Sequence, residues 1–242
     1  MIERGEEVLD ARLTVELPGA RAAFTTRHGG VSEGPYRSLN LGRLTDDQPD
    51  AVRQNRSLLE ARLGMPLAMI RQVHGARVKR LTGPPDPAEP LEELDGQATS
   101  ACDVAPIVLV ADCLPIAVAG EGAAAILHAG WRGLAGGIID EGVRAVRELG
   151  AEEPLAAAIG PGAGACCYEV GEEVHARFES YGPTARDGRY LDLKAVARIQ
   201  LERAGVGSVR DLGLCTICDE DFFSHRRDHG ITGRQAGVVW LS

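Results

Sequence analysis

Aromatic residues are scarce in this chain, since only 4% of its 242 residues are Phe, Trp or Tyr. The hydrophobic core must therefore be built mainly from Ala, Val, Leu and Ile. No stretch reaches 18 consecutive apolar residues, so the sequence predicts no membrane-spanning helix. Residues 1–7 have no apolar run after their charges, which is not the pattern of a secretory signal. We therefore expect a cytoplasmic protein.

Basic residues, cysteine and histidine are also limited in number. The 26 Lys and Arg residues are outnumbered by 35 Asp and Glu residues, and the net charge of -9 argues against a nucleic-acid surface made by bulk positive charge. Six cysteines are too few for a disulfide scaffold of this length, so thiols and metal sites are expected instead. A multicopper oxidase needs about ten histidines, mostly in His-x-His pairs. This chain has six histidines and no such pair, which excludes that activity as the principal one.

Short apolar runs and helical periodicities indicate the fold class. Buried strands are predicted at 21–26, 69–73, 106–110, 114–119, 123–127, 155–159 and 237–241. Helices are predicted at 52–63, at 134–149, from an Asp192 N-cap to Gly205, and around 172–180. Because strands and helices are interleaved irregularly, we expect a single α+β domain over residues 1–242 with mixed sheets.

Three residues that can bind metal lie beside predicted strands. His74 ends an Arg-Gln-Val-His segment, Cys113 separates two apolar runs, and His128 follows another buried run. Two imidazoles and one thiolate would hold zinc with a fourth position open, which is the catalytic pattern. The spacings are long, however, and on spacing alone three unrelated, half-buried side chains are the commoner arrangement.

Arginine and glycine segments suggest anion binding. Arg27 follows the first predicted strand and could pair with a phosphate or carboxylate. Arg132 lies in a glycine-rich turn before a predicted helix, and the free N–H groups at such a helix start can bind an anion. A tight turn with a surface arginine is equally compatible with the second pattern. Phe223 with Arg226 suits stacking on a planar base beside a phosphate, although a core aromatic with a solvated basic edge is the commoner arrangement.

The remaining cysteines form two short pairs. Cys215 and Cys218 have Cys-x-x-Cys spacing, and Cys166 and Cys167 are adjacent. The adjacent pair could complete a four-thiolate zinc site, but the spacing favours buried structural thiols.

Eight segments, taken in chain order, resemble the YfiH-type laccase-domain family. They are Thr-Arg-His-Gly-Gly-Val-Ser (26–32), Ser-Leu-Asn-Leu-Gly (38–42), Gln-Val-His-Gly (72–75), Ala-Asp-Cys-Leu-Pro (111–115), His-Ala-Gly-Trp-Arg-Gly (128–133), Gly-Pro (160–161) with Tyr-Glu-Val-Gly (168–171), Cys-Thr (215–216), and Phe-Phe-Ser-His-Arg-Arg-Asp with Thr-Gly-Arg (222–234). Members have been described as polyphenol oxidases, purine nucleoside phosphorylases and peptidoglycan editing factors. His225 departs from the pattern, because the family usually has Tyr there.

The resemblance implies a central sandwich of mixed β-sheets flanked by helices, a cysteine-hydrolase-like fold. It implies Zn2+ as the cofactor, with His74, Cys113 and His128 as its ligands. It also implies phosphorolysis of adenosine, inosine, guanosine and methylthioadenosine, together with adenosine deamination. The expected small-molecule partners are purine nucleosides and inorganic phosphate, with no nucleic acid and no membrane.

Other residues receive roles in this scheme. Cys113, His128, Asp112 and Arg27 are the expected catalytic residues. Asp112 is either a proton shuttle, a partner of a zinc-bound histidine or a local turn cap. Substrate and phosphate contacts are expected from Arg27, Asn40, Arg132, Tyr168, Phe223 and Arg226, with Phe223 stacking on the purine.

Two alternatives remain. The first is an amidase acting on a peptidoglycan precursor, in which Cys113 is the nucleophile and His128 its base. The second is a binding protein without catalysis, which would tolerate the loss of Cys113 or His128.

Overall fold

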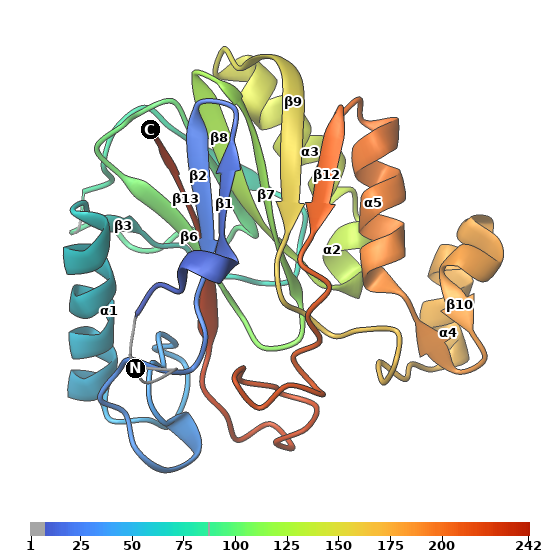
Figure 1. Cartoon of the computed structure of the whole chain (residues 1–242), viewed down its shortest axis with the longest axis horizontal. Coiled ribbons are helices and arrows are strands. Elements are labelled where there is room, and N and C mark those ends of the chain that lie inside the picture. Colours follow the sequence, from blue (N-terminus) through green and yellow to red (C-terminus); the bar gives the residue numbers. More distant parts are fainter. Residues whose placement is uncertain (1–7, 87) are drawn as a thin grey trace.

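The computed structural model describes residues 8–86 and 88–242, and two β-sheets form its centre (Figure 1). The first sheet has the order β1 (Thr14–Leu17), β2 (Ala20–Phe24), β13 (Gln235–Leu241), β6 (Ala105–Val110) and β3 (Leu67–Ala68). The second has the order β12 (Ser208–Asp211), β9 (Glu152–Ile159), β7 (Leu114–Glu121), β8 (Ala123–Ala129), β5 (Gly96–Thr99) and β4 (Val78–Leu81). Both sheets contain parallel and antiparallel pairs.

The two sheets pack face to face through small and β-branched side chains. Ala117, Ala119 and Ile126 of the six-stranded sheet share one buried cluster with Phe24 and Val239 of the five-stranded sheet. All of β8 and nearly all of β7 are buried, which explains why these strands read as continuous apolar runs. The core of this protein therefore contains many alanine side chains and few aromatic ones.

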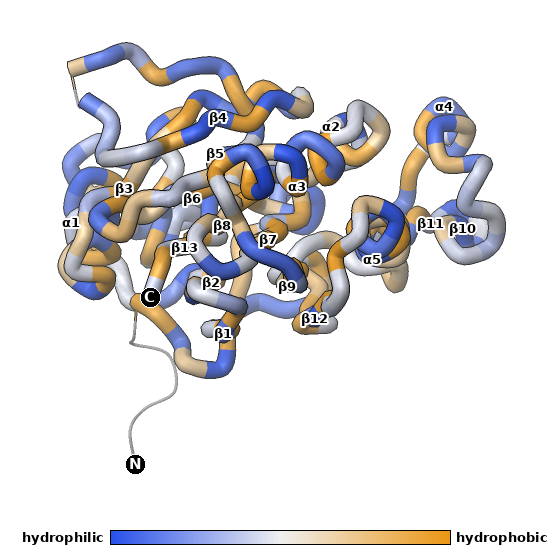
Figure 2. The backbone as a smooth tube through the Cα atoms, turned by 90° about the horizontal axis from the view of Figure 1, so that it is seen from above, coloured by the Kyte–Doolittle hydropathy of each residue, from blue (hydrophilic) through white to orange (hydrophobic). Residues whose placement is uncertain are grey.

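Helices cover both outer faces of the sandwich (Figures 1 and 2). On the six-stranded sheet, α3 (Ile138–Glu148) buries apolar side chains against β7 and β8, and α5 (Leu193–Arg203) packs beside it against α3 and β12. On the other side, α1 (Pro49–Leu63) packs through Leu59 against the five-stranded sheet. This arrangement confirms the expected sandwich of mixed sheets flanked by helices.

Several predicted boundaries are confirmed and others are wrong. α1 ends at Gly64, whose φ of 74° is left-handed, and Asp192 caps α5 by accepting from the Ala195 N–H. The helix predicted at 134–149 is divided into α2 (Trp131–Ala135) and α3, because Gly137 adopts a φ of 87° between them. This left-handed conformation favours glycine and interrupts the helix.

Two further predictions fail for local reasons. Residues 69–73 form no strand, since β3 stops at Ala68 and Arg71 makes only an isolated bridge to Glu93. The helix expected at 172–180 consists of α4 (Glu172–His175) and a 3-10 segment, η3 (Ala176–Thr184), which is kinked at Gly182.

After η3 come the two-residue strands β10 (Arg186–Asp187) and β11 (Tyr190–Leu191). Together, α4, η3, β10 and β11 project from the end of the molecule opposite α1 (Figure 2). The short strands β1, β3, β4, β5, β10, β11 and β12 were not predicted.

Within the described part of the chain, none of the helices has the length and apolar character needed to cross a membrane. Residues 1–7, on which the expected lack of a secretory signal rests, lie outside the described residues, as does Pro87.

Candidate active site

One edge of the six-stranded sheet collects the predicted metal ligands. Cys113 directly precedes β7, and His128 lies near the end of β8, which pairs antiparallel with β7. Asp95 directly precedes β5, which is antiparallel to β8, and His74 lies in the loop before β4. Because neighbouring antiparallel strands begin and end at the same edge, residues far apart in sequence meet there.

The ligand atoms of His74, Cys113 and His128 all lie within 4.8 Å of one another. The two imidazole rings meet edge to face, with centroids 4.7 Å apart and an interplanar angle of 73°. Gly130 allows this close approach, since a Cβ at that position would lie 2.8 Å from the Cys113 Sγ. Three convergent nitrogen and sulfur donors fit a single zinc ion with one open position. The structure therefore brings together the three predicted ligands.

Asp95 orients this group and was missed by the sequence analysis. Its Oδ1 lies 2.8 Å from the His128 Nδ1, which leaves the Nε2 of that ring as the available ligand atom. The same carboxylate accepts the backbone N–H groups of His74 at 2.8 Å and of Gly75 at 2.6 Å. Asp95 is fully buried. Its only sequence signal was a carboxylate directly before a strand that was itself not predicted.

The hydrogen bonds of the Asp112 carboxylate go to two residues of the C-terminal segment and not to a histidine of the described site. The carboxylate accepts the Thr216 hydroxyl at 2.7 Å and the Arg226 backbone N–H at 2.7 Å. These are bonds to a segment more than 100 residues away in sequence. The carboxylate that contacts a histidine of the site is therefore Asp95, and Asp112 secures the loop that follows β12.

Cys113 and His128 shift each other's protonation. Burial opposes ionisation of the thiol, but the charge and hydrogen bonds of His128, aided by His74, lower the pKa of Cys113 to about 6. Burial likewise disfavours the imidazolium, but Cys113 and Asp95 raise the pKa of His128 to about 9. At neutral pH the metal-free pair is therefore a thiolate beside an imidazolium, with Asp95 on the far side of the ring.

This pairing predicts how zinc affinity depends on pH. Between about pH 6 and about pH 9 the metal-free pair retains one proton, on His128, and zinc must displace it. The dissociation constant for zinc is expected to rise about tenfold for each unit of pH decrease within that window. Competition with a chelator at several pH values measures this dissociation constant. The same titration of Cys113→Ala gives the background from zinc bound elsewhere on the chain, which is subtracted. An affinity that does not change with pH would contradict the assigned protonation.

Tyr168 lies close enough to the Cys113 thiolate for their charges to interact, and Arg226 and Arg132 act on the same tyrosine. Burial, reinforced by the negative charge of Cys113 and opposed by Arg226, raises the pKa of Tyr168 to about 12. The Arg226 guanidinium lies 5.2 Å from the Tyr168 ring centroid, and its Nη1 donates to the Glu169 carbonyl. Arg132 is exposed on α2, where its guanidinium stacks on Trp131. Its positive charge also acts on the Tyr168 hydroxyl.

Arg234 is a second site residue that the sequence analysis missed. Burial lowers the pKa of Arg234, while the charges of Cys113 and Asp112 act in the opposite direction. One of its Nη atoms donates to the carbonyls of Thr232 and Gly233, which fixes the side chain. The Thr-Gly-Arg segment was part of the resemblance, and this was the available signal.

Three other predicted contacts serve the protein's own packing. The Arg27 Nε donates to the Arg37 carbonyl at 2.8 Å, and its guanidinium covers the Phe223 ring at 4.7 Å from the centroid. Phe223 is fully buried, so its ring is not open to a purine in this conformation. Asn40 is also buried, and its amide is satisfied by Thr45, Asp47, Gly42 and Arg234.

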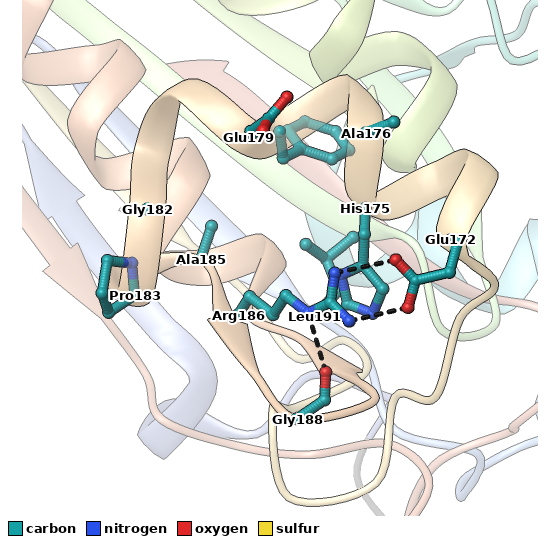
Figure 3. A pocket seen from close by; sticks show the side chains of 11 residues that line it. Glu172, His175, Ala176, Glu179, Gly182, Pro183, Ala185, Arg186, Gly188 and Leu191 are labelled. Carbon is teal, nitrogen blue, oxygen red and sulfur yellow. Dashed lines mark hydrogen bonds and ion pairs between the residues drawn. The ribbon is translucent and has the colours of Figure 1, made fainter.

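A cavity of about 490 Å³ lies elsewhere, in the projection formed by α4, η3 and β10 (Figure 3). Glu172 and Arg186 form an ion pair on its wall, and neither ring nitrogen of the buried His175 has a hydrogen-bond partner. Its lining includes none of the predicted site residues.

The expectation that the paired cysteines are separate, buried structural thiols is wrong. Cys166, Cys167, Cys215 and Cys218 lie together, and each is at least partly exposed. Within residues 8–86 and 88–242, this cluster and the group around Cys113 are the two places where His, Cys or carboxylate side chains could jointly hold a metal ion.

Comparisons with known proteins agree with this architecture. The family model described as "Multi-copper polyphenol oxidoreductase laccase" matches residues 21–242. A Streptomyces coelicolor protein named purine nucleoside phosphorylase SCO2081 is 41% identical, covering 92% of this chain and 96% of its own length. A Geobacillus stearothermophilus protein named purine nucleoside phosphorylase YlmD is 39% identical, covering 91% and 90% respectively.

Solved structures show the same fold. The crystal structure of YlmD from Geobacillus stearothermophilus has a TM-score of 0.86 at 35% identity, covering 97% of this chain and 99% of that one. Bacillus licheniformis YfiH has a TM-score of 0.83 at 32% identity, covering 92% and 93%. The chain therefore belongs to the YfiH-type laccase-domain family.

Proposed function

We propose that this protein is a zinc-dependent purine nucleoside phosphorylase. The observation that carries the proposal is the convergence of His74, Cys113 and His128, beside Arg132, Arg226 and Tyr168. Relatives about 40% identical over nearly the whole chain are named purine nucleoside phosphorylase, which supports the same reaction class. The family model's name refers to copper, but six histidines without a His-x-His pair do not match a multicopper cluster.

The donor set suits zinc, because imidazole and thiolate are among its preferred ligands. When bound, zinc would supply a positive charge and Lewis acidity at the open position. Asp95 holds His128 in the tautomer that presents its Nε2. The main-chain bonds from His74 and Gly75 to the same carboxylate hold the loop of the other imidazole in place.

Phosphorolysis joins a phosphate oxygen to C1′ of the ribose while the bond from C1′ to the purine nitrogen breaks. The base leaves with the bonding electron pair and takes up a proton, and ribose 1-phosphate is the other product. Arg132 and Arg226 are the proposed phosphate contacts, because each guanidinium offers several donors to an oxyanion. The Tyr168 hydroxyl stays protonated at neutral pH and can donate a hydrogen bond to the substrate.

The proposed substrates are adenosine, inosine, guanosine and methylthioadenosine. Deamination of adenosine is proposed at the same site, where the oxygen of an activated water would bond to C6 while the C6–N bond breaks, giving inosine and ammonia. For Arg27 we propose an indirect role: its guanidinium packs on the Phe223 ring and bonds to the Arg37 carbonyl, and it does not contact phosphate directly.

A product assay tests the proposal directly. Purified protein with its zinc counted is given adenosine or inosine, with and without phosphate. Phosphate-dependent release of free base, with equimolar ribose 1-phosphate, is the expected result. Inosine formed from adenosine without phosphate would identify deamination. If zinc-loaded protein consumes no nucleoside under either condition, the proposed function is wrong.

The phosphate contacts can be tested separately. Arg132→Gln and Arg226→Gln are each expected to raise the KM for phosphate about tenfold or more, since a hydrogen bond to a charged group contributes roughly 1.5–3 kcal/mol. The KM for nucleoside should change less. Arg144→Gln is the matched control, because Arg144 is an exposed arginine on α3 that pairs with Glu141 and Glu148. Equal effects on both substrates would argue against a phosphate site.

A thiol hydrolase is the second candidate, and one observation favours it. Asp95, His128 and Cys113 stand in the order carboxylate, imidazole and thiolate, the arrangement of an activated nucleophile. An amide bond in a peptidoglycan precursor is the proposed substrate in that case. A thiolate bound to zinc is not free to attack, so firm zinc binding by Cys113 counts against this candidate.

A further inference from the structure

Four cysteine sulfurs meet between two loops that follow parallel strands. Cys166 and Cys167 lie in the loop after β9, and Cys215 and Cys218 lie after β12. Because β9 and β12 are parallel neighbours, both loops leave the sheet at the same edge. The Cys167 Sγ lies 3.3 Å from that of Cys166, 3.4 Å from that of Cys215 and 3.2 Å from that of Cys218.

The whole group is compact. The Sγ atoms of Cys166 and Cys218 are 3.4 Å apart, and all four sulfurs lie within 4.8 Å of one another. A zinc–sulfur bond of about 2.3 Å places the sulfurs of a tetrahedral site about 3.8 Å apart. A disulfide joins only two sulfurs, at about 2.05 Å. The observed spacings are closer to the edges of a tetrahedron than to any pairing of the four.

The backbone around the sulfurs is arranged to support negative charge. The Gly164 N–H donates to the Cys215 Sγ at 3.2 Å, and the backbone N–H groups of Ile217 and Cys218 also face that sulfur. Gly164 has no Cβ, and one placed there would lie 3.2 Å from the Cys166 Sγ and 3.2 Å from the Cys215 Sγ. N–H donors that converge on sulfur stabilise a thiolate, the form that binds metal.

We propose that Cys166, Cys167, Cys215 and Cys218 bind a second zinc ion in a closed, four-thiolate structural site. Four thiolates complete the tetrahedral coordination of zinc and leave no position for a substrate. The site is thus distinct in chemistry from the open site formed by His74, Cys113 and His128.

The position of the site explains what it would stabilise. Main-chain hydrogen bonds already join the two loops, because the Thr216 N–H donates to the Gly162 carbonyl and the Gly162 N–H to the Leu214 carbonyl. Tyr168 directly follows Cys167, and Thr216 directly follows Cys215 and donates to Asp112. A zinc ion joining the loops would therefore hold Tyr168 and the Asp112 contact in place at the edge of the active site.

Zinc counting by mass spectrometry tests the proposal on the full chain. Wild type is expected to hold two zinc ions per chain. Cys113→Ala and Cys218→Ser should each hold one, and the double variant none. Cys102→Ser, the matched control, should keep both, because Cys102 is exposed and belongs to neither cluster. A wild-type count of one, lost in Cys113→Ala, would overturn the proposal.

A spectroscopic measurement keeps the test valid even if Cys218→Ser fails to fold. Cys113→Ala expressed with cobalt in place of zinc is expected to show the intense thiolate-to-cobalt charge-transfer absorption of a four-sulfur tetrahedral site. Absence of that absorption would reject the site. Two other results would also reject the four-thiolate zinc site. One is that the purified protein contains iron and inorganic sulfide instead of zinc at these cysteines. The other is that its intact mass is lower by two hydrogens for each disulfide formed among them. None of these outcomes depends on nucleoside turnover, so the proposed function is tested independently.

Discussion

Cys113→Ala is expected to lose one zinc ion and to reduce phosphorolysis by about 10³-fold or more. The variant removes one of three ligands, and the Lewis acidity of a bound metal contributes several kcal/mol to a reaction of this kind. It also leaves His128 beside Asp95 without the thiolate that helps to hold its proton. Zinc content and the kcat/KM for inosine with phosphate measure the two effects together.

The matched control is Cys102→Ser, which removes an exposed thiol outside the site and should leave both quantities unchanged. Turnover that persists in Cys113→Ala after the zinc of this site is lost would show that the reaction does not use the cluster. His74→Ala separates the two candidate functions. It should abolish phosphorolysis and zinc binding at this site, whereas a thiol hydrolase built from Asp95, His128 and Cys113 keeps its nucleophile in that variant.

Asp95→Asn is expected to weaken zinc binding at this site by about 10–100-fold, the usual effect of losing a carboxylate behind a metal-bound histidine. An asparagine retains one acceptor but loses the charge that faces His128. The N–H groups of His74 and Gly75 would also face a weaker acceptor or an amide donor. The lost charge misplaces the His128 ring, and the weaker acceptor misplaces the loop that carries His74. We therefore expect kcat/KM to fall together with the affinity for zinc.

Asp112→Asn is the informative comparison, because Asp112 is a buried carboxylate beside Cys113 whose hydrogen bonds go to Thr216 and Arg226. It should leave zinc affinity within about threefold of wild type while altering turnover through Thr216 and Arg226, a direct consequence of their different bonding partners. Affinity is measured by chelator competition with the metal-free protein. If Asp112→Asn lowers affinity more than Asp95→Asn, the assignment of the two carboxylates is reversed.

Local pattern was sufficient for the elements that are apolar throughout. The runs at 114–119 and 123–127 predict β7 and β8, because a strand buried on both faces contains little else than apolar residues. The local pattern was insufficient for β4, β5 and β12. Each of these strands has only four residues and depends on pairing with distant partners. The strands β4 and β12 also contain charged residues. The register of such strands is a property of the sheet and not of the segment.

The residue order was enough to predict the ligand types, the apolar strands beside them and, through the family resemblance, the grouping of His74, Cys113 and His128. Three features depend on the tertiary structure: Asp95 contacts His128, the charge of Cys113 acts on Arg234, and the Cys166–Cys167 pair meets Cys215 and Cys218, about 50 residues later in the chain. The physical reason is the strand order β12-β9-β7-β8-β5, which brings the ends of distant segments to one edge. That order results from packing two sheets and their helices around one core, and no local period in the chain encodes it.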